Sequence, residues 1–342
     1  MKIIFLIEDF HPSIGGPYTA IKETIKELRK KKIQANLISK NKFFFLKTVS
    51  IIKQIRNVDI CHIYGGWTFF YLKVFIISYF LKKKIIIHPF GIYEPWAFAQ
   101  KKFKKIIAWN LYQKYILNKA DVIHCVSNME QKNLLKLNSS FRTVVLPYGI
   151  ANRLIKRKIK RKFNKRALFL SRLHPKKGLD DLIKAWINVD NKSWKLDIVG
   201  PYEDRNYYDS LQLLIYNSRN KNIRILKPVF NHYKKYKLFS KYDFFVLPTK
   251  SDPFAMVILE SLSQGLPVLT NINTPWNNIK TYNAGWFIKD SYLELKKNLN
   301  IIFNTSKSQF YIKSRNAIFL ANKFNWKHIS KEYIHMYMNL LK

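Results

Sequence analysis

The sequence predicts an α/β protein made of two doubly wound domains, each built on a parallel sheet. Short apolar runs rich in Ile, Val and Phe alternate with amphipathic stretches along almost the whole chain. These runs are continuously apolar, as in parallel strands that helices cover on both faces. A length of 342 residues also favours two domains over one.

The expected strands form two groups, one in each half of the chain. In the first half they are Lys2–Ile7, Ala35–Ser39, Asp59–Ile63, Lys84–His88, Asp121–Val126 and Thr143–Leu146. In the second half they are Ala167–Leu170, Lys195–Val199, Ile223–Leu226, Asp243–Leu247 and Pro267–Thr270. Apolar stripes one helical turn apart predict the helices between them; two clear stripes are Ile21, Thr24, Ile25 and Leu28, and Leu179, Leu182, Ile183 and Trp186.

Apolar periodicity lapses between the two groups, from Gly149 to Arg166, where basic residues take over. We therefore divide the chain into domains at residues 1–152 and 153–321, with a ligand cleft between them. Residues 322–342 form a predicted helix that returns to the first domain. Because ligands of doubly wound sheets lie outside the carboxyl ends of the strands, the loops that follow the strands are where a site is expected.

Cysteine usage and hydropathy narrow the setting in which the protein works. Cys61 and Cys125 are its two cysteines, too few for a disulfide framework or a thiolate metal site, so a reducing cytoplasm is expected. Glu8 comes too early for a signal peptide. The most apolar run, Trp67–Leu81, contains Lys73 and is shorter than the ~20 residues of a membrane span. We predict a core helix there, with contact to a membrane surface as the alternative.

The charge balance is strongly basic. Sixty-one Lys and Arg residues stand against 21 Asp and Glu, a formal net charge of +40. Such a field indicates a polyanionic partner, which could be nucleic acid, an anionic membrane face or phosphorylated substrates. No acidic residue occurs from Gln131 to Leu179, and Lys156–Arg166 is the densest basic cluster. A lysine-rich compositional bias is the alternative, although it would not explain the scarcity of acidic residues.

Two loops after expected strands carry groups suited to phosphate. In Glu8–Pro17, Gly15 and Gly16 permit close backbone approach, and a helix start offers free N–H groups; a plain turn is the alternative. In Ser171–Gly178, Arg172 offers a planar fork and Lys177 a point charge, which together suit a diphosphate. Two solvated cations in a very basic chain are the alternative for that pair.

A third loop, Thr249–Asp252, leads into a predicted helix Phe254–Gln264 that Gly265 ends. Asp252 followed by Pro253 is typical of an N-cap and a first-turn proline, so Asp252 has a purely structural interpretation as well. Glu260 lies within an apolar stretch and needs a partner. A ribose diol would be a suitable one.

Several collinear segments resemble one family. The resemblance rests first on SDPFAMVILESLSQGLPVLT at Ser251–Thr270 and SRLHPKKGLDDLIKAW at Ser171–Trp186. Both are similar to segments of retaining glycosyltransferases of family 4, which have the GT-B fold. Three Trp-bearing segments resemble the lipopolysaccharide, O-antigen and capsule branch of that family: HIYGGW (His62–Trp67), GIYEPW (Gly91–Trp96) and TPW (Thr274–Trp276).

The resemblance implies a role for each matching position. Arg172 and Lys177 would neutralise the donor diphosphate, and Glu260 would bind the ribose hydroxyls. The first domain would lie on the acceptor side and the second would bind the donor. The remaining donor-binding positions would be the backbone of Phe254, Ala255 and Met256, together with Gly15 and Gly16.

This chain departs from the family pattern at four places, one of which is Tyr64, where the HGLW-like segment has a second histidine. The E-x7-E pair is here Asp252 and Glu260, so the first carboxylate, which we assign to catalysis, is one methylene shorter. Ala255 stands where a glycine is usual. His88 ends its strand two positions before Phe90, where relatives carry a His or Arg, and we include it as a catalytic candidate that would touch the donor sugar. His62 and His124 are expected to support the core.

The expected function is therefore sugar transfer from a UDP- or GDP-linked donor to a saccharide or lipid-linked saccharide, with retention of anomeric configuration. No D-x-D triplet occurs in the sequence, so Arg172 and Lys177 would replace a metal ion and no cofactor is expected. The basic surface would hold the enzyme on the anionic inner face of the cytoplasmic membrane. The candidate contacts are Arg29–Lys32, Lys82–Lys84 and Lys101–Lys105.

Two other functions remain open on the sequence. A sugar-nucleotide epimerase of the same fold would release a free sugar without needing an acceptor. A nucleic-acid-binding protein would account for the charge directly. We expect no nucleic-acid partner, because no recognised nucleic-acid module occurs and the basic residues are spread over both α/β halves.

Overall fold

The computed structural model describes residues 1–39, 48–155, 163–190 and 193–342. Most of the basic cluster Lys156–Arg166, at residues 156–162, lies outside the described residues. The chain divides into two compact units: Met1–Gly149 with Trp326–Lys342 form unit 1, and Ile150–Asn325 form unit 2. The expected domain limits were residues 152 and 321.

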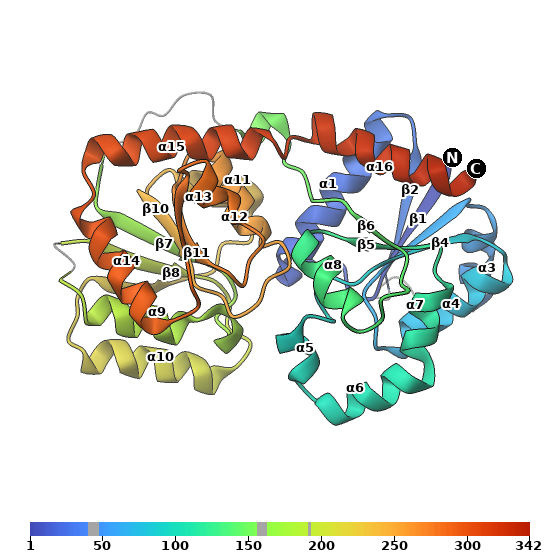
Figure 1. Cartoon of the computed structure of the whole chain (residues 1–342), viewed down its shortest axis with the longest axis horizontal. Helices are drawn as coiled ribbons and strands as arrows, with labels where there is room; N and C mark the ends of the chain where they lie inside the picture. The colour runs from blue at the N-terminus through green and yellow to red at the C-terminus, as the bar shows by residue number, and fades with distance from the viewer. Residues whose placement is uncertain (40–47, 156–162, 191–192) are drawn as a thin grey trace. The chain divides into compact units, whose positions relative to one another are not determined.

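Unit 1 contains, among its described residues, a six-stranded parallel sheet flanked by helices (Figure 1). The strand order is β2-β1-β3-β4-β5-β6. The strands are β1 (Lys2–Ile7), β2 (Gln34–Ser39), β3 (Ile60–Tyr64), β4 (Lys84–His88), β5 (Val122–Cys125) and β6 (Thr143–Val145). The helices are α1 (Gly16–Lys30), α3 (Thr48–Arg56), α4 (Phe69–Phe80), α5 (Pro95–Ala99), α6 (Lys102–Ala108), the π-helical turn η2 (Trp109–Gln113), α7 (Lys114–Lys119), α8 (Asn128–Leu135) and α16 (Trp326–Leu341).

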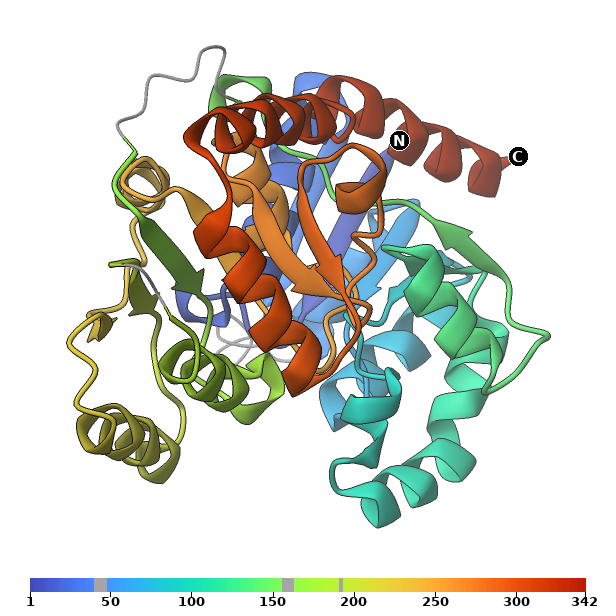
Figure 2. The same cartoon turned by 60° about the vertical axis from the view of Figure 1, so that its left-hand side comes forward.

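Unit 2 repeats this architecture, with a second parallel sheet flanked by helices in its described part (Figure 2). This sheet has six strands in the order β12-β11-β10-β7-β8-β9. The strands are β7 (Arg166–Leu170), β8 (Lys195–Val199), β9 (Ile223–Leu226), β10 (Phe244–Leu247), β11 (Val268–Asn271) and β12 (Gly285–Ile288). The helices are the short η4 (Pro175–Lys177), α9 (Leu179–Ile187), α10 (Arg205–Asn217), α11 (His232–Phe239), α12 (Met256–Ser263), α13 (Asn278–Thr281), α14 (Tyr292–Asn304) and α15 (Lys307–Asn322).

The predicted fold class is confirmed: both sheets are parallel and every strand expected from the sequence is present. One strand, β12, was not predicted. It has four residues and begins with Gly285, where a Cβ atom would lie 2.1 Å from the carbonyl oxygen of Val268. A strand that starts with glycine lacks the apolar run on which sequence prediction depends.

The C-terminal helix packs on unit 1, as predicted. Its stripe of buried side chains includes Tyr333 and Tyr337. The Tyr337 hydroxyl lies 3.0 Å from Nδ1 of His62 on β3, and Tyr333 lies 3.4 Å from Nε2 of His124 on β5. Helix α16 thus contributes hydroxyl groups to the interior of unit 1.

The apolar run Trp67–Leu81 forms helix α4, but the expectation of a core helix was only half right. Tyr71, Val74 and Phe75 are buried, whereas Phe69 and Phe80 are each 78% exposed. One face therefore packs on the sheet and the other faces outward. No helix in the described part of the chain is long and apolar enough to cross a membrane.

Candidate active site

The strand order of unit 2 reverses between β7 and β10. From β7 the chain proceeds outward through β8 and β9, whereas from β10 it proceeds the other way through β11 and β12. In doubly wound sheets, ligands bind beyond the carboxyl ends of the strands at such a reversal. The two loops that leave this point are residues 171–178 after β7 and 248–255 after β10, which are two of the three loops selected from the sequence.

Hydrogen bonds join these two loops directly. The carbonyl oxygen of Lys176 accepts from the hydroxyl of Thr249 at 2.9 Å and from the backbone N–H of Lys250 at 2.7 Å. Gly178 has φ +66°, and a Cβ atom there would lie 2.1 Å from the carbonyl oxygen of Pro248. Only glycine allows both this backbone conformation and this close approach.

Lys177 and Asp252 form the central contact between the loops. Lys177 Nζ lies 2.7 Å from Asp252 Oδ2, and the lysine is only 8% exposed. Burial favours the neutral acid, but the charge and hydrogen bond of Lys177, the charge of Lys176 and the N–H of Ala255 outweigh it and lower the pKa of Asp252. The site therefore holds an ionised carboxylate against a nearly buried ammonium group.

The prediction that Asp252 is an N-cap with Pro253 in the first turn was wrong in its detail. Helix α12 begins at Met256, and Ala255 is its N-cap, in the left-handed conformation at φ 55°. Asp252 Oδ1 instead accepts from the N–H groups of Phe254 at 3.2 Å and Ala255 at 2.6 Å. The aspartate thus orders the turn that precedes the helix and pairs with Lys177 through its other oxygen.

The TPW segment, Thr274–Trp276, contacts this turn through Trp276. Trp276 is buried, and its indole N–H donates to the carbonyl oxygen of Phe254 at 2.5 Å. The rings of Phe254 and Trp276 lie 5.5 Å apart, and Phe324 lies 5.0 Å from Trp276. In the sequence, TPW is only a segment that resembles the family; in the structure it positions the backbone at Phe254.

Arg172 lies on the exposed rim of the site rather than within it. Its guanidinium pairs with Glu203, and the two side chains are 46% and 48% exposed. A pair this exposed contributes little stability. The arginine can therefore leave Glu203 for a more highly charged ligand at small cost.

Glu260 has a protein partner that the sequence did not reveal. It is 2% exposed, and its Oε1 lies 2.5 Å from Nζ of Lys235 on α11. This buried carboxylate does have a partner, as expected from the sequence, but the partner is Lys235. No local signal marks Lys235, because it is one of several lysines on an ordinary surface helix.

His88 belongs to a buried network in unit 1. Its side chain has no exposed surface, its Nδ1 donates to the carbonyl oxygen of His124 at 2.6 Å, and its Nε2 accepts from the hydroxyl of Tyr148. Burial lowers the pKa of His88 well below its ordinary value, and the charge of His124 acts in the same direction. The neutral imidazole is thus fixed as one tautomer, and contact with a sugar would require Tyr148 to move from Nε2.

The other two donor-site candidates in unit 1, Gly15 and Gly16, lie in the loop after β1 and at the start of α1. Gly15 has φ +72° and open space where a Cβ atom would lie, and α1 begins at Gly16. Glu130 is a positioning residue that sequence analysis missed: its carboxylate accepts from the N–H groups of Gly91 at 2.7 Å and Val126 at 2.8 Å. It joins the loops after β4 and β5, and its place inside an unremarkable helix gave no signal.

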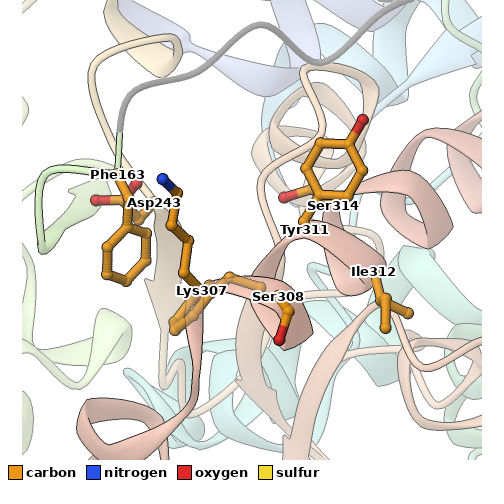
Figure 3. A pocket seen from close by; sticks show the side chains of 8 residues that line it. Phe163, Asp243, Lys307, Ser308, Tyr311, Ile312 and Ser314 are labelled. Carbon is orange, nitrogen blue, oxygen red and sulfur yellow. The ribbon is translucent and has the colours of Figure 1, made fainter.

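A cavity of about 450 Å³ lies elsewhere in unit 2 (Figure 3). Its lining residues include Phe163, Asp243 and Tyr311, from the beginnings of β7 and β10 and from α15. Because it lies at the amino ends of these strands, it is at the opposite edge of the sheet from Lys177 and Asp252. The carboxylate of Asp243 accepts backbone N–H groups of Asn164 and Arg166, so this cavity is a different feature from the site.

Comparisons with known proteins agree with this geometry. Residues 152–317 match the model for glycosyl transferases group 1. An uncharacterized glycosyltransferase of Methanocaldococcus jannaschii is 24% identical over 66% of this chain but only 61% of its own length, less than two thirds. The capsular polysaccharide biosynthesis glycosyltransferase CapM of Staphylococcus aureus is 23% identical over 71% of this chain and 67% of its own.

Further similarity extends over the whole chain. The GDP-mannose:cellobiosyl-diphosphopolyprenol alpha-mannosyltransferase of Xanthomonas campestris is 20% identical over 98% of this chain and 96% of its own. The crystal structure of HepE from Anabaena in complex with UDP and glucose has a TM-score of 0.81 at 18% identity, covering 99% of this chain and 100% of that one.

Two parallel doubly wound units, with a basic and acidic pair at the strand-order reversal of the second, define a protein of the GT-B class. The part of the chain that is similar to glycosyl transferases group 1, residues 152–317, lies in unit 2, which holds this pair.

Proposed function

We propose that the protein transfers a sugar from a nucleoside-diphosphate sugar to a saccharide, with retention of anomeric configuration. The observation that carries this proposal is the Lys177–Asp252 pair, which links the loops after β7 and β10 at the start of α12. HepE was crystallised with UDP and glucose, which supports a nucleotide-linked donor. The proposal covers both a UDP-linked and a GDP-linked donor.

In this proposal the site acts on the charge that develops as the glycosidic bond breaks. Negative charge accumulates on the leaving diphosphate, so cations and free N–H groups directed at it stabilise the transition state. Lys177 supplies a positive charge already held in place by Asp252, and Arg172 adds one from the rim. Because these two cations would take the place of a metal ion, we expect transfer to persist in the presence of EDTA.

The nucleoside would be held beside α12. Glu260 would accept the ribose hydroxyls, while Phe254, Ala255 and Met256 would present backbone groups to the sugar and phosphate. Gly15 and Gly16 would approach the phosphate from unit 1, and His88 would reach the sugar once Tyr148 leaves its Nε2. The leaving phosphate would take the proton of the acceptor hydroxyl, so no dedicated protein base is required.

The acceptor we propose is a lipid-linked saccharide used in cell-surface polysaccharide synthesis. Two relatives support it: CapM by its assignment to capsular polysaccharide, and the Xanthomonas enzyme by its diphosphopolyprenol acceptor. The protein would then work at the inner face of the cytoplasmic membrane. Its charge of +40 would favour an anionic leaflet.

A thermal-shift screen against UDP-, GDP- and ADP-sugars tests the donor site first. We expect one nucleotide class to raise the melting temperature of the wild-type protein and to have a much smaller effect on Lys177→Ala. Lys184→Ala, which removes an exposed lysine on α9, is the matched control and should respond like the wild type. Equal shifts in wild type and Lys177→Ala, or no shift with any nucleotide, would contradict the proposed site.

A further inference from the structure

A helical arm of unit 1 carries an outward row of large apolar side chains. This arm, residues 101–119, comprises α6, η2 and α7, and both views place α6 at the outer edge of its unit, away from the sheet (Figures 1 and 2). Phe103 is 77% exposed and Leu111 is 75% exposed. Three further apolar residues of the arm are also exposed: Ile106, Ile107 and Tyr115.

The opposite face of the arm is firmly anchored, so the exposed row belongs to an ordered element. Gln113, Ile116 and Leu117 are buried. The Tyr112 hydroxyl donates to the carbonyl oxygen of Trp67 at 2.5 Å, and the ring of Trp109 lies 6.2 Å from that of Phe141. The π-helical turn η2 accommodates an extra residue within the helix.

Lysines lie at both ends of this apolar row, and acidic residues are absent from it. Between Pro95 and Ala120 the sequence contains no Asp or Glu. The arm lysines are Lys101, Lys102, Lys104, Lys105, Lys114 and Lys119. An apolar face bordered by lysines is the pattern of helices that lie in the plane of a membrane interface. A nucleic-acid surface would present cations and polar groups without a row of large aliphatic and aromatic side chains.

The other two basic clusters considered for membrane contact differ from the arm. Arg29 donates to the carbonyl oxygen of Ala35 at 2.8 Å, and Lys30 pairs with Glu27 at 2.5 Å. In the second cluster, Lys83 donates to the carbonyl oxygen of Arg56 at 2.8 Å, and Lys84 pairs with Asp121 at 3.3 Å. These four cations are engaged in internal contacts. Exposed Phe80 gives the second cluster some apolar surface as well, and Lys105 of the arm donates to the carbonyl oxygen of Ala97. The arm differs in having lysines at both ends of a row of exposed apolar side chains.

We propose that the arm of residues 101–119 docks the protein on an anionic lipid bilayer. Phe103, Ile107 and Leu111 enter the boundary between headgroups and acyl chains, and the neighbouring lysines contact the acidic headgroups. This inference deepens the proposed function and rests on it for the lipid-linked nature of the acceptor. Docking itself requires no turnover, so it can be measured independently of sugar transfer.

Co-sedimentation with vesicles tests the proposal. The full-length protein is mixed with phosphatidylglycerol/phosphatidylethanolamine vesicles or with pure phosphatidylcholine vesicles, at two salt concentrations. We expect binding to the anionic vesicles, weakened but not abolished by salt. The variant F103S/L111S should lose on the order of 10- to 100-fold in partition coefficient, because two large apolar groups no longer leave water.

A matched control removes comparable apolar area from unit 2. In L213S/Y216S both substituted residues lie on α10 and are 59% and 81% exposed, and this variant should bind vesicles like the wild type. The charge variant K102Q/K104Q should lose binding to anionic vesicles most strongly at low salt. Wild-type partition by F103S/L111S, no vesicle binding by the wild type, or binding to duplex DNA in place of vesicles would overturn the proposal.

Nucleotide-induced thermal shifts, recorded on the same variants, separate this inference from the proposed function. Each variant should retain the wild-type response to the donor nucleotide. Vesicle binding without any nucleotide response would leave the docking surface in place and contradict the proposed transferase function. A nucleotide response without vesicle binding would support the donor site and contradict the docking surface.

Discussion

Two lysines govern the carboxylates of the candidate site, and they differ in what the sequence reveals about them. Lys177 follows a strand in a loop rich in cations, so its position could be inferred. Its partner could not, because Asp252 is 75 positions away and the 2.7 Å contact depends on the pairing of β7 with β10. Lys235 lies on a surface helix, and only the fold brings it to Glu260.

The first prediction concerns the Lys235–Glu260 pair. Lys235→Met leaves Glu260 ionisable, buried and unpaired, which should destabilise unit 2 by about 3 kcal/mol; we take the low end of the range for a broken buried pair because Lys235 is 18% exposed. Replacing both partners, as in K235M/E260L, should recover most of this loss. Urea titration measures both effects.

The same double variant separates stability from ligand binding. If Glu260 binds the ribose, K235M/E260L should fold but should bind the donor nucleotide at least about 10-fold more weakly than the wild type, since a hydrogen bond to a charged group contributes about 1.5–3 kcal/mol. Wild-type nucleotide affinity in this stable variant would reduce Glu260 to a structural role.

The second prediction concerns Ala255, which stands where a glycine is usual in the family it resembles. The structure shows why glycine suits the position: Ala255 is left-handed, with φ 55° and ψ 68°. That conformation costs a non-glycine residue about 1–2 kcal/mol. We expect Ala255→Gly to raise the melting temperature of unit 2 by about 2–4 °C without loss of donor binding. A lower melting temperature would show that the Cβ atom makes contacts that outweigh the strain.

At the scale of elements, continuous apolar strands were predictable because both of their faces are buried. The ends of helices were less predictable from the sequence. Helix α12 begins two residues later than expected, because the Asp252 carboxylate orders a separate turn before it. The roles of the three Trp-bearing segments are also visible only in the folded structure, where the first two contact each other. Gly66 of the first lies against Tyr93 of the second, and the rings of Trp67 and Tyr93 are 5.2 Å apart.

Three adjacent strands carry a chain of buried neutral imidazoles. Nε2 of His62 on β3 lies 3.4 Å from Nδ1 of His124 on β5. His124 donates through its Nε2 to the carbonyl oxygen of Leu146 at 2.8 Å. Burial lowers the pKa of His124 from 6.5 to about 4. The expectation that His62 and His124 support the core agrees with these contacts.

The third prediction follows from this lowered pKa. The unfolded chain takes up a proton on His124 below pH 6.5, whereas the folded protein does so only near pH 4, so stability should fall with acidification across this window. The loss from His124 alone should reach about 2 kcal/mol at pH 5. Urea titrations at pH 7 and pH 5 measure it.

A non-titrating variant provides the control for this pH dependence. In His124→Gln the stability should be lower at neutral pH, because the buried packing changes, but its decline between pH 7 and pH 5 should be shallower than in the wild type. Equal declines in both proteins would show that His124 does not cause the acid sensitivity.

For the whole molecule, the sequence predicted two doubly wound units, a returning C-terminal helix and a basic surface. The order of the strands could not be predicted from the sequence, because it depends on pairing between distant segments. The reversal between β7 and β10 that locates the site is visible only in the sheet. The net charge of +40 could be counted, but not the fact that the arm of residues 101–119 combines lysines with exposed apolar side chains. We propose that these two features form the donor site and the membrane contact of the transferase.

The most direct test of the account is a transfer assay with EDTA present. The donor identified by thermal shift, carrying a radiolabelled sugar, is incubated with membrane lipid extract and with the wild-type protein, Lys177→Ala or Lys184→Ala. We predict that wild type and Lys184→Ala label the lipid fraction, and that Lys177→Ala, assayed at a temperature at which it remains folded, is reduced at least about 100-fold, as when one transition-state contact is removed. Undiminished labelling by Lys177→Ala, or release of free sugar without labelled lipid, would contradict the account.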